Sequence, residues 1–170
     1  TGLPSYVKEQ YQDSDDYIAS TSYVAEYMLS NNSDQYFSKE EDPLFVEDVA
    51  RAQELLAEAG FSGGEGFPEL TYTYPNSEKD ALLAQGIQAQ LKQNLGINIK
   101  LNGVETQVYS IERSEGTYEL IRHSWTADYN DPINFLNLYT AYSGGNFNHV
   151  NDPEYDELIE KSNSATDPAE

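Results

Sequence analysis

A short polar segment of the sequence combines three side chains suited to binding a charged organic ligand, namely Trp125, Asp128 and Tyr129. The segment directly follows a stretch that we expect to form a strand, and ligands of open α/β sheets bind just beyond the carboxyl ends of strands. A carboxylate such as that of Asp128 pairs strongly with an ammonium group, while the two aromatic rings can pack against apolar parts of the same ligand. The segment therefore predicts a site for an amine-bearing ligand.

Asp131, in the same segment, has a different interpretation. It stands immediately before Pro132, and this order is typical of the start of a helix, where the carboxylate accepts hydrogen bonds from free backbone N–H groups. We predict that Asp131 caps a short helix beginning at Pro132, which leaves Asp128 for the ligand.

The charge of the chain argues against several classes of partner. It carries 30 acidic and 9 basic residues, for a formal net charge of −21. Such a surface repels phosphate backbones and anionic lipid headgroups, so we expect no nucleic-acid or membrane-surface binding. Hydrophobic residues make up 38% and aromatic residues 12% of the chain, far from the composition of disordered acidic segments. We expect a folded protein whose acidic residues mostly lie on a solvated surface.

Enzymatic and metal-dependent functions find little support in the sequence. The chain has no cysteine and two histidines, His123 and His149, which excludes thiolate zinc sites and a multi-histidine metal centre. Asp128 and Asp131 could serve as a pair of catalytic carboxylates, but in so acidic a chain such neighbours are expected by chance. Arg122 and His123 are interpreted as a solvated or pocket-edge pair. We expect a protein that is not an enzyme and has no cofactor and no metal.

The periodicity of apolar residues places the polar segment within an α/β arrangement. Residues 70–74, 78–94 and 97–101 have the patterns of a strand, a helix and a strand, which in this order form a βαβ unit with parallel strands. The other expected elements are a helix over 46–59 closed by Gly60, a helix over 105–114 with Val108, Ile111 and Tyr109 facing inward, a third strand from Tyr118 to about Trp125, and a last helix capped by Asp152.

The two ends of the chain have weaker patterns. The first 45 residues are expected to be irregular, apart from a short helix around residues 21–30. The final residues, Thr166-Asp167-Pro168-Ala169-Glu170, are typical of the opening of a helix. We interpret this ending as a chain cut from a longer protein.

In chain order, five motifs resemble those of a known family. They are Ala52-Gln53-Glu54-Leu55-Leu56-Ala57-Glu58-Ala59-Gly60-Phe61, the run Leu91 to Leu101, Gly116-Thr117-Tyr118-Glu119-Leu120, Trp125-Thr126-Ala127-Asp128-Tyr129-Asn130-Asp131-Pro132 with Phe135-Leu136, and Asn151-Asp152-Pro153-Glu154-Tyr155-Asp156-Glu157-Leu158. Over roughly residues 44–170, the ordered set resembles the extracellular solute-binding proteins of bacterial family 5, the oligopeptide- and dipeptide-binding proteins of ABC importers.

The resemblance implies a fold and a division into domains. Members have two lobes that enclose the peptide, and these motifs belong to the C-terminal lobe. The expected fold is an α/β lobe like that of periplasmic binding proteins, with βαβ units forming a mostly parallel mixed sheet flanked by helices. Residues 1–45 would be an irregular lead-in, and residues 46–170 a lobe of a two-lobed protein, truncated at its C-terminus.

The resemblance also implies roles for individual residues. The aspartate that accepts the α-ammonium group of the bound peptide corresponds to Asp128, and the tryptophan that lines a side-chain pocket corresponds to Trp125. The arginine that meets a ligand carboxylate in some members corresponds to Arg122. Tyr129 completes the set of expected ligand-binding residues.

The implied partners are a peptide, the permease subunits of the importer and a second lobe of the same polypeptide. The implied location is outside the cytoplasm, in the periplasm or at the cell surface as a lipoprotein whose lipid anchor lies beyond these residues. An open sheet edge in a truncated lobe would also allow pairing with a second copy.

Other ligands remain open within this architecture, because related proteins bind dipeptides, nickel chelates, haem or sugars. Asp128 favours an amine, and the two histidines argue against direct metal chelation. A plain structural or interaction domain is the alternative if no concave surface lies beside residues 122–131.

Overall fold

The computed structural model describes residues 22–30, 35–39, 44 and 46–166, and the statements below refer to these. They fall into two compact units, which are described separately: Glu47–His123 belongs to the first, and the second combines the described residues of Ser20–Val46 with those of Ser124–Glu170. Within the second unit, the described residues before Glu47 pack on the later ones. Tyr23, for instance, lies against Tyr139 with ring centroids 5.4 Å apart.

The first unit is built on a parallel sheet of three strands in the order β2-β1-β3. Strand β1 (Leu70–Pro75) lies between β2 (Ile99–Val104) and β3 (Leu120–Ile121), and Leu70 is opposite Ile99 while Tyr72 is opposite Leu120. The parallel βαβ unit predicted from the sequence is confirmed. The third strand is much shorter than the predicted 118–125, because its pairing with β1 ends with one further hydrogen bond, from the backbone N–H of Arg122 to the carbonyl of Thr73.

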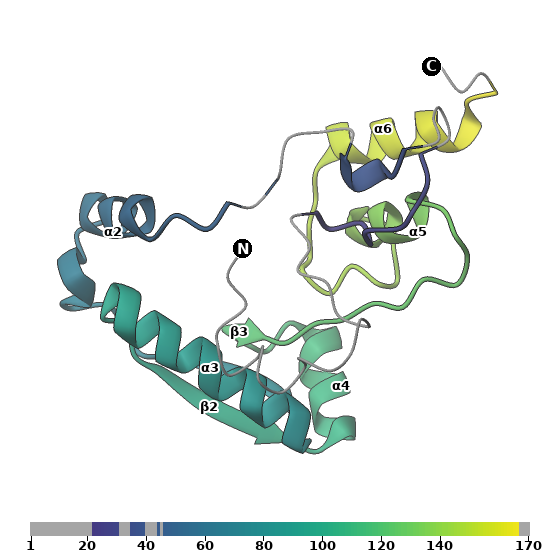
Figure 1. Ribbon diagram of the computed structural model, residues 1–170. Coiled ribbons are helices and arrows are strands. Elements are labelled where there is room, and N and C mark those ends of the chain that lie inside the picture. Colours follow the sequence, from purple (N-terminus) through teal and green to yellow (C-terminus); the bar gives the residue numbers. More distant parts are fainter. Residues whose placement is uncertain (1–21, 31–34, 40–43, 45, 167–170) are drawn as a thin grey trace. The chain divides into compact units, whose positions relative to one another are not determined.

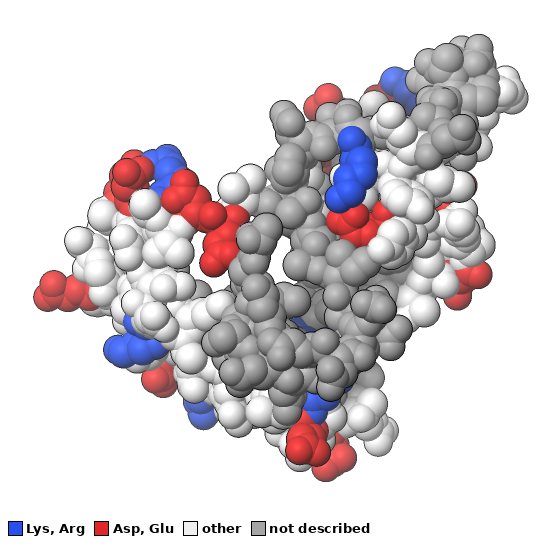
Figure 2. Space-filling model, viewed as in Figure 1, with Lys and Arg blue, Asp and Glu red and all other residues white. Residues whose placement is uncertain are grey.

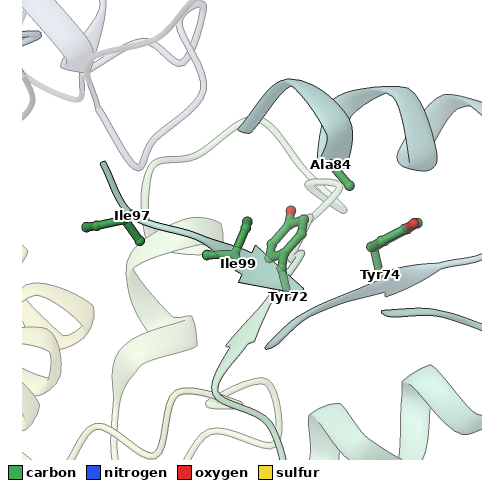
Figure 3. Close-up of a cluster of buried hydrophobic side chains, with 5 residues drawn as sticks. All are labelled: Tyr72, Tyr74, Ala84, Ile97 and Ile99. Carbon is green, nitrogen blue, oxygen red and sulfur yellow. The ribbon is translucent and has the colours of Figure 1, made fainter. Parts of the chain in front are cut away.

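Three helices belong to the same unit as this sheet (Figure 1). They are α2 (Val49–Glu58), α3 (Glu78–Leu95) and α4 (Thr106–Glu115). Helix α3 packs on β1 and β2, α4 on β1, and α2 on α3. The buried core contains Tyr72 and Tyr74 of β1, Ile99 of β2, the nearby Ile97, and Ala84 of α3, which faces the strands in Figure 3. Thr73, on the opposite face of β1, is also buried, so both faces of the central strand are covered.

Helix α2 ends where the sequence predicts but begins at Val49 rather than at residue 46, with Asp48 as its N-cap. Asp48 accepts a hydrogen bond from the backbone N–H of Arg51 at the start of α2, and Gly60 has a φ of 93° after its end. The N–H of Phe61 then bonds to the carbonyl of Leu56 at 2.9 Å, which is the long hydrogen bond of a Schellman motif. Local sequence therefore accounts for the limits of α2.

The turn after α2, which includes η2 (Ser62–Gly64), packs tightly on the turn after α3. A Cβ atom at Gly64 would lie 2.6 Å from the carbonyl carbon of Gly96, and a Cβ at Gly96 would overlap the carbonyl of Gly63. Both Gly64 and Gly96 also have positive φ, so backbone packs directly on backbone at a contact that admits no side chain.

The predicted inner face of α4 is partly wrong. Tyr109 is 7% exposed, whereas Val108 and Ile111 are 45% and 48% exposed. The hydroxyl of Tyr109 donates a hydrogen bond to the carbonyl of Arg122 at 2.6 Å, and this bond together with the buried ring selects the side of the helix that faces the sheet.

The second unit contains η1 (Phe37–Lys39), α5 (Ile133–Leu136), η3 (Asn137–Tyr139) and α6 (Pro153–Ser164). The predicted helix around 21–30 is wrong for the described residues 22–30, which form bends and a turn. Leu29 instead pairs in antiparallel fashion with Tyr36, so its backbone hydrogen-bonding groups are used across a turn rather than along a helix.

Helix α6 begins as the sequence predicts. Asp152 Oδ1 accepts hydrogen bonds from the backbone N–H groups of Glu154 and Tyr155. Ile159 is buried, whereas Leu158 is 57% exposed. The hydroxyl of Tyr155 donates to the carbonyl of Leu136 at 2.8 Å, which ties α6 to α5. The helix opening expected at the end of the chain falls on residues 167–170, outside the described residues.

Two general expectations concern the surface and membranes. Figure 2 shows acidic side chains spread over the visible face rather than gathered in one cluster, as expected for solvated charge. In the part of the chain that the structure describes, no helix is long and apolar enough to cross a membrane.

Candidate ligand-binding site

The polar segment singled out in the sequence connects β3 to α5. Its residues 122–127 have no regular structure, and a bend over 128–130 precedes α5. The chain therefore leaves the carboxyl end of a parallel strand and exposes a loop, as the strand–loop–helix reading of the sequence predicts.

Asp131 caps α5, as predicted. Its Oδ1 accepts a hydrogen bond from the backbone N–H of Ile133 at 2.9 Å, and its carbonyl accepts one from the N–H of Asn134 at 3.0 Å. Pro132 has the helical dihedral angles of a first helical residue, φ −51° and ψ −33°. The carboxylate of Asp131 is thus used within the protein.

The indole of Trp125 is held by a partner that sequence reasoning missed. Its Nε1–H donates a hydrogen bond to Oδ1 of Asn134 at 2.8 Å, and Asn134 is only 7% exposed. The signal in the sequence was an amide between the apolar residues Ile133 and Phe135 of a short helix. Trp125 itself remains 39% exposed, so the ring is held in place while part of its surface faces solvent.

Asp128 and Tyr129 both lie exposed on the bend, and Tyr129 keeps 55% of its surface accessible. The same bend forms one wall of a shallow hollow of about 460 Å³ within the second unit. The hollow is lined by Ala25, Glu26, Tyr27, Met28, Ala127, Tyr129 and Asn130. A concave surface therefore adjoins the predicted segment.

The acidic residue of this hollow, Glu26, is neutralised from within the protein. Its side chain is 12% exposed, and Lys39 Nζ lies 2.9 Å from its Oε2. The hydroxyl of Ser38 donates to the same Oε2 at 3.2 Å. Tyr27 and Tyr129, which also line the hollow, are both exposed.

Arg122 belongs to the first unit and is paired there. Its Nε lies 2.7 Å from Oδ1 of Asp80, near the start of α3. Next to it, burial lowers the pKa of His123, and the positive charges of Arg113 and Arg122 lower it further. The neutral imidazole is therefore favoured near neutral pH. Arg122 and His123 are better described as part of a packed structural cluster than as a solvated pair.

Among the described residues, no group of three or more His, Asp or Glu side chains lies close enough together to hold a metal ion.

Comparison with known proteins agrees with this architecture. The family model of the bacterial extracellular solute-binding proteins, family 5 Middle, matches residues 13–147. The periplasmic murein peptide-binding protein MppA from Escherichia coli is 36% identical over 115 residues, which are 68% of this chain and 21% of that protein. The probable deoxycholate-binding periplasmic protein YgiS from Escherichia coli is 34% identical over 123 residues, or 71% of this chain and 22% of that protein.

A solved structure shares the fold as well. The crystal structure of the periplasmic oligopeptide-binding protein OppAIV from Borrelia burgdorferi superposes with a TM-score of 0.70 and 35% identity, over 77% of this chain and 26% of that one. The predicted lobe, similar to that of periplasmic binding proteins, is confirmed. The chain spans about a fifth of the length of the curated relatives. It belongs to the bacterial extracellular solute-binding proteins of family 5.

Proposed function

We propose that these residues are the peptide-binding part of the substrate-binding protein of an ABC importer, which captures oligopeptides outside the cytoplasm and delivers them to the membrane permease. Two relatives are named for binding murein peptides and oligopeptides. The observation that carries the proposal is the exposed carboxylate of Asp128, three residues after an indole held in place by Asn134.

Asp128 accepts the α-ammonium group of the peptide. A hydrogen bond between charged groups contributes about 1.5–3 kcal/mol when water is excluded. Asp131, the next carboxylate along the chain, already accepts a hydrogen bond from the first turn of α5. Asp128 is therefore the carboxylate of this loop that we assign to the ligand. The rings of Trp125 and Tyr129 pack against the peptide side chains.

Backbone hydrogen bonds to an extended peptide would add affinity without selecting its side chains. Side-chain pockets that retain water would then accept many sequences. Arg122 is left out of the proposed contact set because its guanidinium is paired with Asp80.

Asp128→Asn tests this assignment in the complete protein that carries these residues. Affinities are measured by calorimetry for one peptide with a free amino terminus and for the same peptide N-acetylated. Asp128→Asn is expected to weaken binding of the free-amine peptide by about tenfold or more, because the charged acceptor is lost. The N-acetylated peptide, which carries no ammonium group, should lose little from the substitution.

Asp131→Asn is the matched control. It removes the same charge from the same loop, and asparagine caps helices nearly as well as aspartate, so both affinities should stay within about twofold. Equal losses of affinity for both peptides in Asp128→Asn would contradict a contact to the ammonium group.

The complete protein is proposed to contain a second lobe that closes over the peptide, and a lipid anchor or a periplasmic location that keeps it near the permease. Mass spectrometry of the ligand that co-purifies with the complete protein identifies its class directly. A peptide mixture supports the proposal, whereas a single compound that is not a peptide contradicts it.

A second candidate is the capture of a different amphipathic solute. YgiS, named as a probable deoxycholate-binding protein, has similar identity to this chain, and the exposed rings of Tyr27 and Tyr129 beside the hollow suit an apolar ring system. Deoxycholate carries no ammonium group, so its binding should be insensitive to Asp128→Asn. Calorimetry with deoxycholate alone separates the two candidates.

A further inference from the structure

The hollow in the second unit has an exposed aromatic ring on each of the two segments that line it. Tyr27 comes from the early segment and is 63% exposed, and Tyr129 comes from the bend before α5 and is 55% exposed. The faces of a tyrosine ring carry partial negative charge, which attracts an ammonium or guanidinium group within about 6 Å of the ring centre. Two such rings at one hollow are suited to the cationic end of a side chain.

The ring of Tyr27 is held by a neighbour that leaves one of its faces uncovered. Tyr36 packs against it with ring centroids 5.3 Å apart and an angle of 83° between the ring planes. In this T-shaped arrangement the edge of one ring meets a single face of the other. The contact therefore restrains Tyr27 before any ligand arrives, and a restrained ring loses less conformational entropy on binding.

The carboxylate that lines the hollow carries its own counter-ion. Glu26 Oε2 lies 2.9 Å from Lys39 Nζ, and the Glu26 side chain is only 12% exposed. Lys39 lies outside the lining of the hollow, but its positive charge offsets the negative charge that Glu26 would otherwise contribute there. This ion pair therefore limits how strongly the hollow attracts a cation.

The described residues of the second unit are strongly acidic as a set. Their lysine and arginine residues are Lys39 and Lys161, and Lys161 Nζ lies 2.6 Å from Oε1 of Glu157. Each of these lysines is thus engaged by a glutamate. The resulting negative potential raises the local concentration of cations, so charge complementarity favours a positively charged ligand over a neutral or acidic one. The acidic residues of the set are Glu26, Asp128, Asp131, Asp152, Glu154, Asp156, Glu157 and Glu160.

We propose that the hollow is a subsite for a positively charged side chain, lysine or arginine, of a peptide ligand. The inference rests on the proposed function and adds the class of peptide taken, because basic peptides are favoured over neutral ones of the same shape. The cationic group lies against the rings of Tyr27 and Tyr129. Ala127 and Tyr129 of the hollow are the direct chain neighbours of Asp128, so subsite and ammonium acceptor belong to the same bend.

The test uses alanine peptides of three, four and five residues in which one alanine is replaced, at each position in turn, by arginine or by citrulline. Citrulline has nearly the shape of arginine and no charge, so the ratio of the two affinities isolates the effect of charge. Calorimetry on the complete protein that carries these residues measures both. At one position or more, the arginine peptide should bind about fivefold more tightly than the citrulline peptide.

Substitution of the two rings should remove this preference. In the double variant Tyr27→Leu with Tyr129→Leu, the ratio of arginine to citrulline affinity should fall to about twofold or less, because leucine retains apolar surface but has no ring face. Tyr142→Leu is the matched control, since Tyr142 is 60% exposed in the same unit and lies outside the lining of the hollow. Its ratio should stay unchanged, and an equal fall in both variants would contradict the subsite.

Lys39→Met separates the hollow from the general charge of the unit. It removes the counter-ion of Glu26, so the ratio of arginine to citrulline affinity should rise by about threefold. Lys161→Met removes the same charge from the same unit by breaking a different ion pair, on α6, and should leave the ratio unchanged. An equal rise in both variants would attribute the preference to general charge and would contradict the subsite.

The unaltered protein decides the matter even if a variant fails to fold. Equal affinities for the arginine and citrulline peptides at every position would overturn the subsite while leaving the proposed function standing, since peptides would still bind. No binding of any of these peptides would contradict the proposed function, and the inference with it.

Discussion

The indole Nε1–H of Trp125 donates a hydrogen bond to Oδ1 of Asn134, nine residues further along the chain, at 2.8 Å. This contact joins the exposed loop to α5, whose first residues are capped by Asp131 from the same loop. The loop is therefore fastened at two points, one on each side of Asp128. A preorganised loop of this kind loses less conformational entropy when it binds a ligand.

Asn134→Ala should loosen the loop. The substitution leaves the indole N–H of Trp125 without its acceptor and removes a buried side chain, so the free energy of unfolding should fall by about 1–3 kcal/mol. The emission of Trp125, the one tryptophan of the chain, should shift to longer wavelength as the ring becomes more hydrated. Asn148→Ala serves as control because Asn148 is exposed; an equal effect of both substitutions would show that the Trp125 contact contributes nothing specific.

Gly96→Ala should destabilise the protein more than Gly60→Ala. Both positions have positive φ, 73° and 93°, and an alanine in this conformation costs about 1–2 kcal/mol. A Cβ at Gly60 meets no atom within 4 Å, whereas one at Gly96 overlaps the carbonyl of Gly63. Backbone cannot rotate away as a side chain can, so the cost at Gly96 adds a packing term. Denaturant unfolding of the two variants measures the difference, and equal losses would contradict the proposed close contact.

His123 should make stability depend on pH. Burial, followed by the charges of Arg113 and Arg122, lowers the pKa of His123 in the folded state below its ordinary value of 6.5. The unfolded chain then binds a proton as the pH falls through 6.5, before the folded protein does, so the free energy of unfolding decreases in that interval. The neutral form contributes its full stabilisation above pH 6.5.

The measurement is the free energy of unfolding of the protein and of His123→Asn between pH 7.5 and 5. The variant should lose less stability on acidification than the unaltered protein. His149→Asn is the control and should keep the steeper dependence. Identical curves for the unaltered protein and His123→Asn would rule out this source of the pH dependence.

Asp152→Ala should weaken the start of α6. The carboxylate accepts hydrogen bonds from two backbone N–H groups of the first turn, at 3.0 and 3.3 Å, and loss of such a cap costs about 1 kcal/mol. Asp152→Asn retains an acceptor and should cost only a few tenths of a kcal/mol. Thermal unfolding of the two variants provides the comparison; a cap without effect on stability would leave their unfolding temperatures equal.

Several features of the fold could be read from short stretches of sequence. The ends of α2 and α3 were predicted from Gly60 and Gly96, because a left-handed glycine stops a helix through contacts with the preceding turn alone. The caps Asp131 and Asp152 were predicted for the same reason, since a capping carboxylate bonds to N–H groups two or three residues away. The parallel pairing of β1 with β2 followed from the length of the helix between them.

Other predictions failed where local patterns left the choice open. Helical spacing was compatible with Val108, Tyr109 or Ile111 facing inward, and the bond from Tyr109 to the carbonyl of Arg122 decided it. The spacing of apolar residues around 21–30 suggested a helix, but pairing of Leu29 with Tyr36 and packing of Tyr23 on Tyr139 led to a different structure. In each case the decisive partner is distant in the sequence.

The sequence by itself determined the family, the order of strands and helices, and the loop that carries Asp128, because motifs, caps and apolar periodicity act within a few residues. Tertiary structure alone decided that Asn134 accepts the indole hydrogen bond of Trp125 and that Asp80 forms an ion pair with Arg122. Asp80 and Arg122 are separated by forty-two positions (122 − 80). Only the parallel sheet, which places the start of α3 beside the end of β3, brings their opposite charges together.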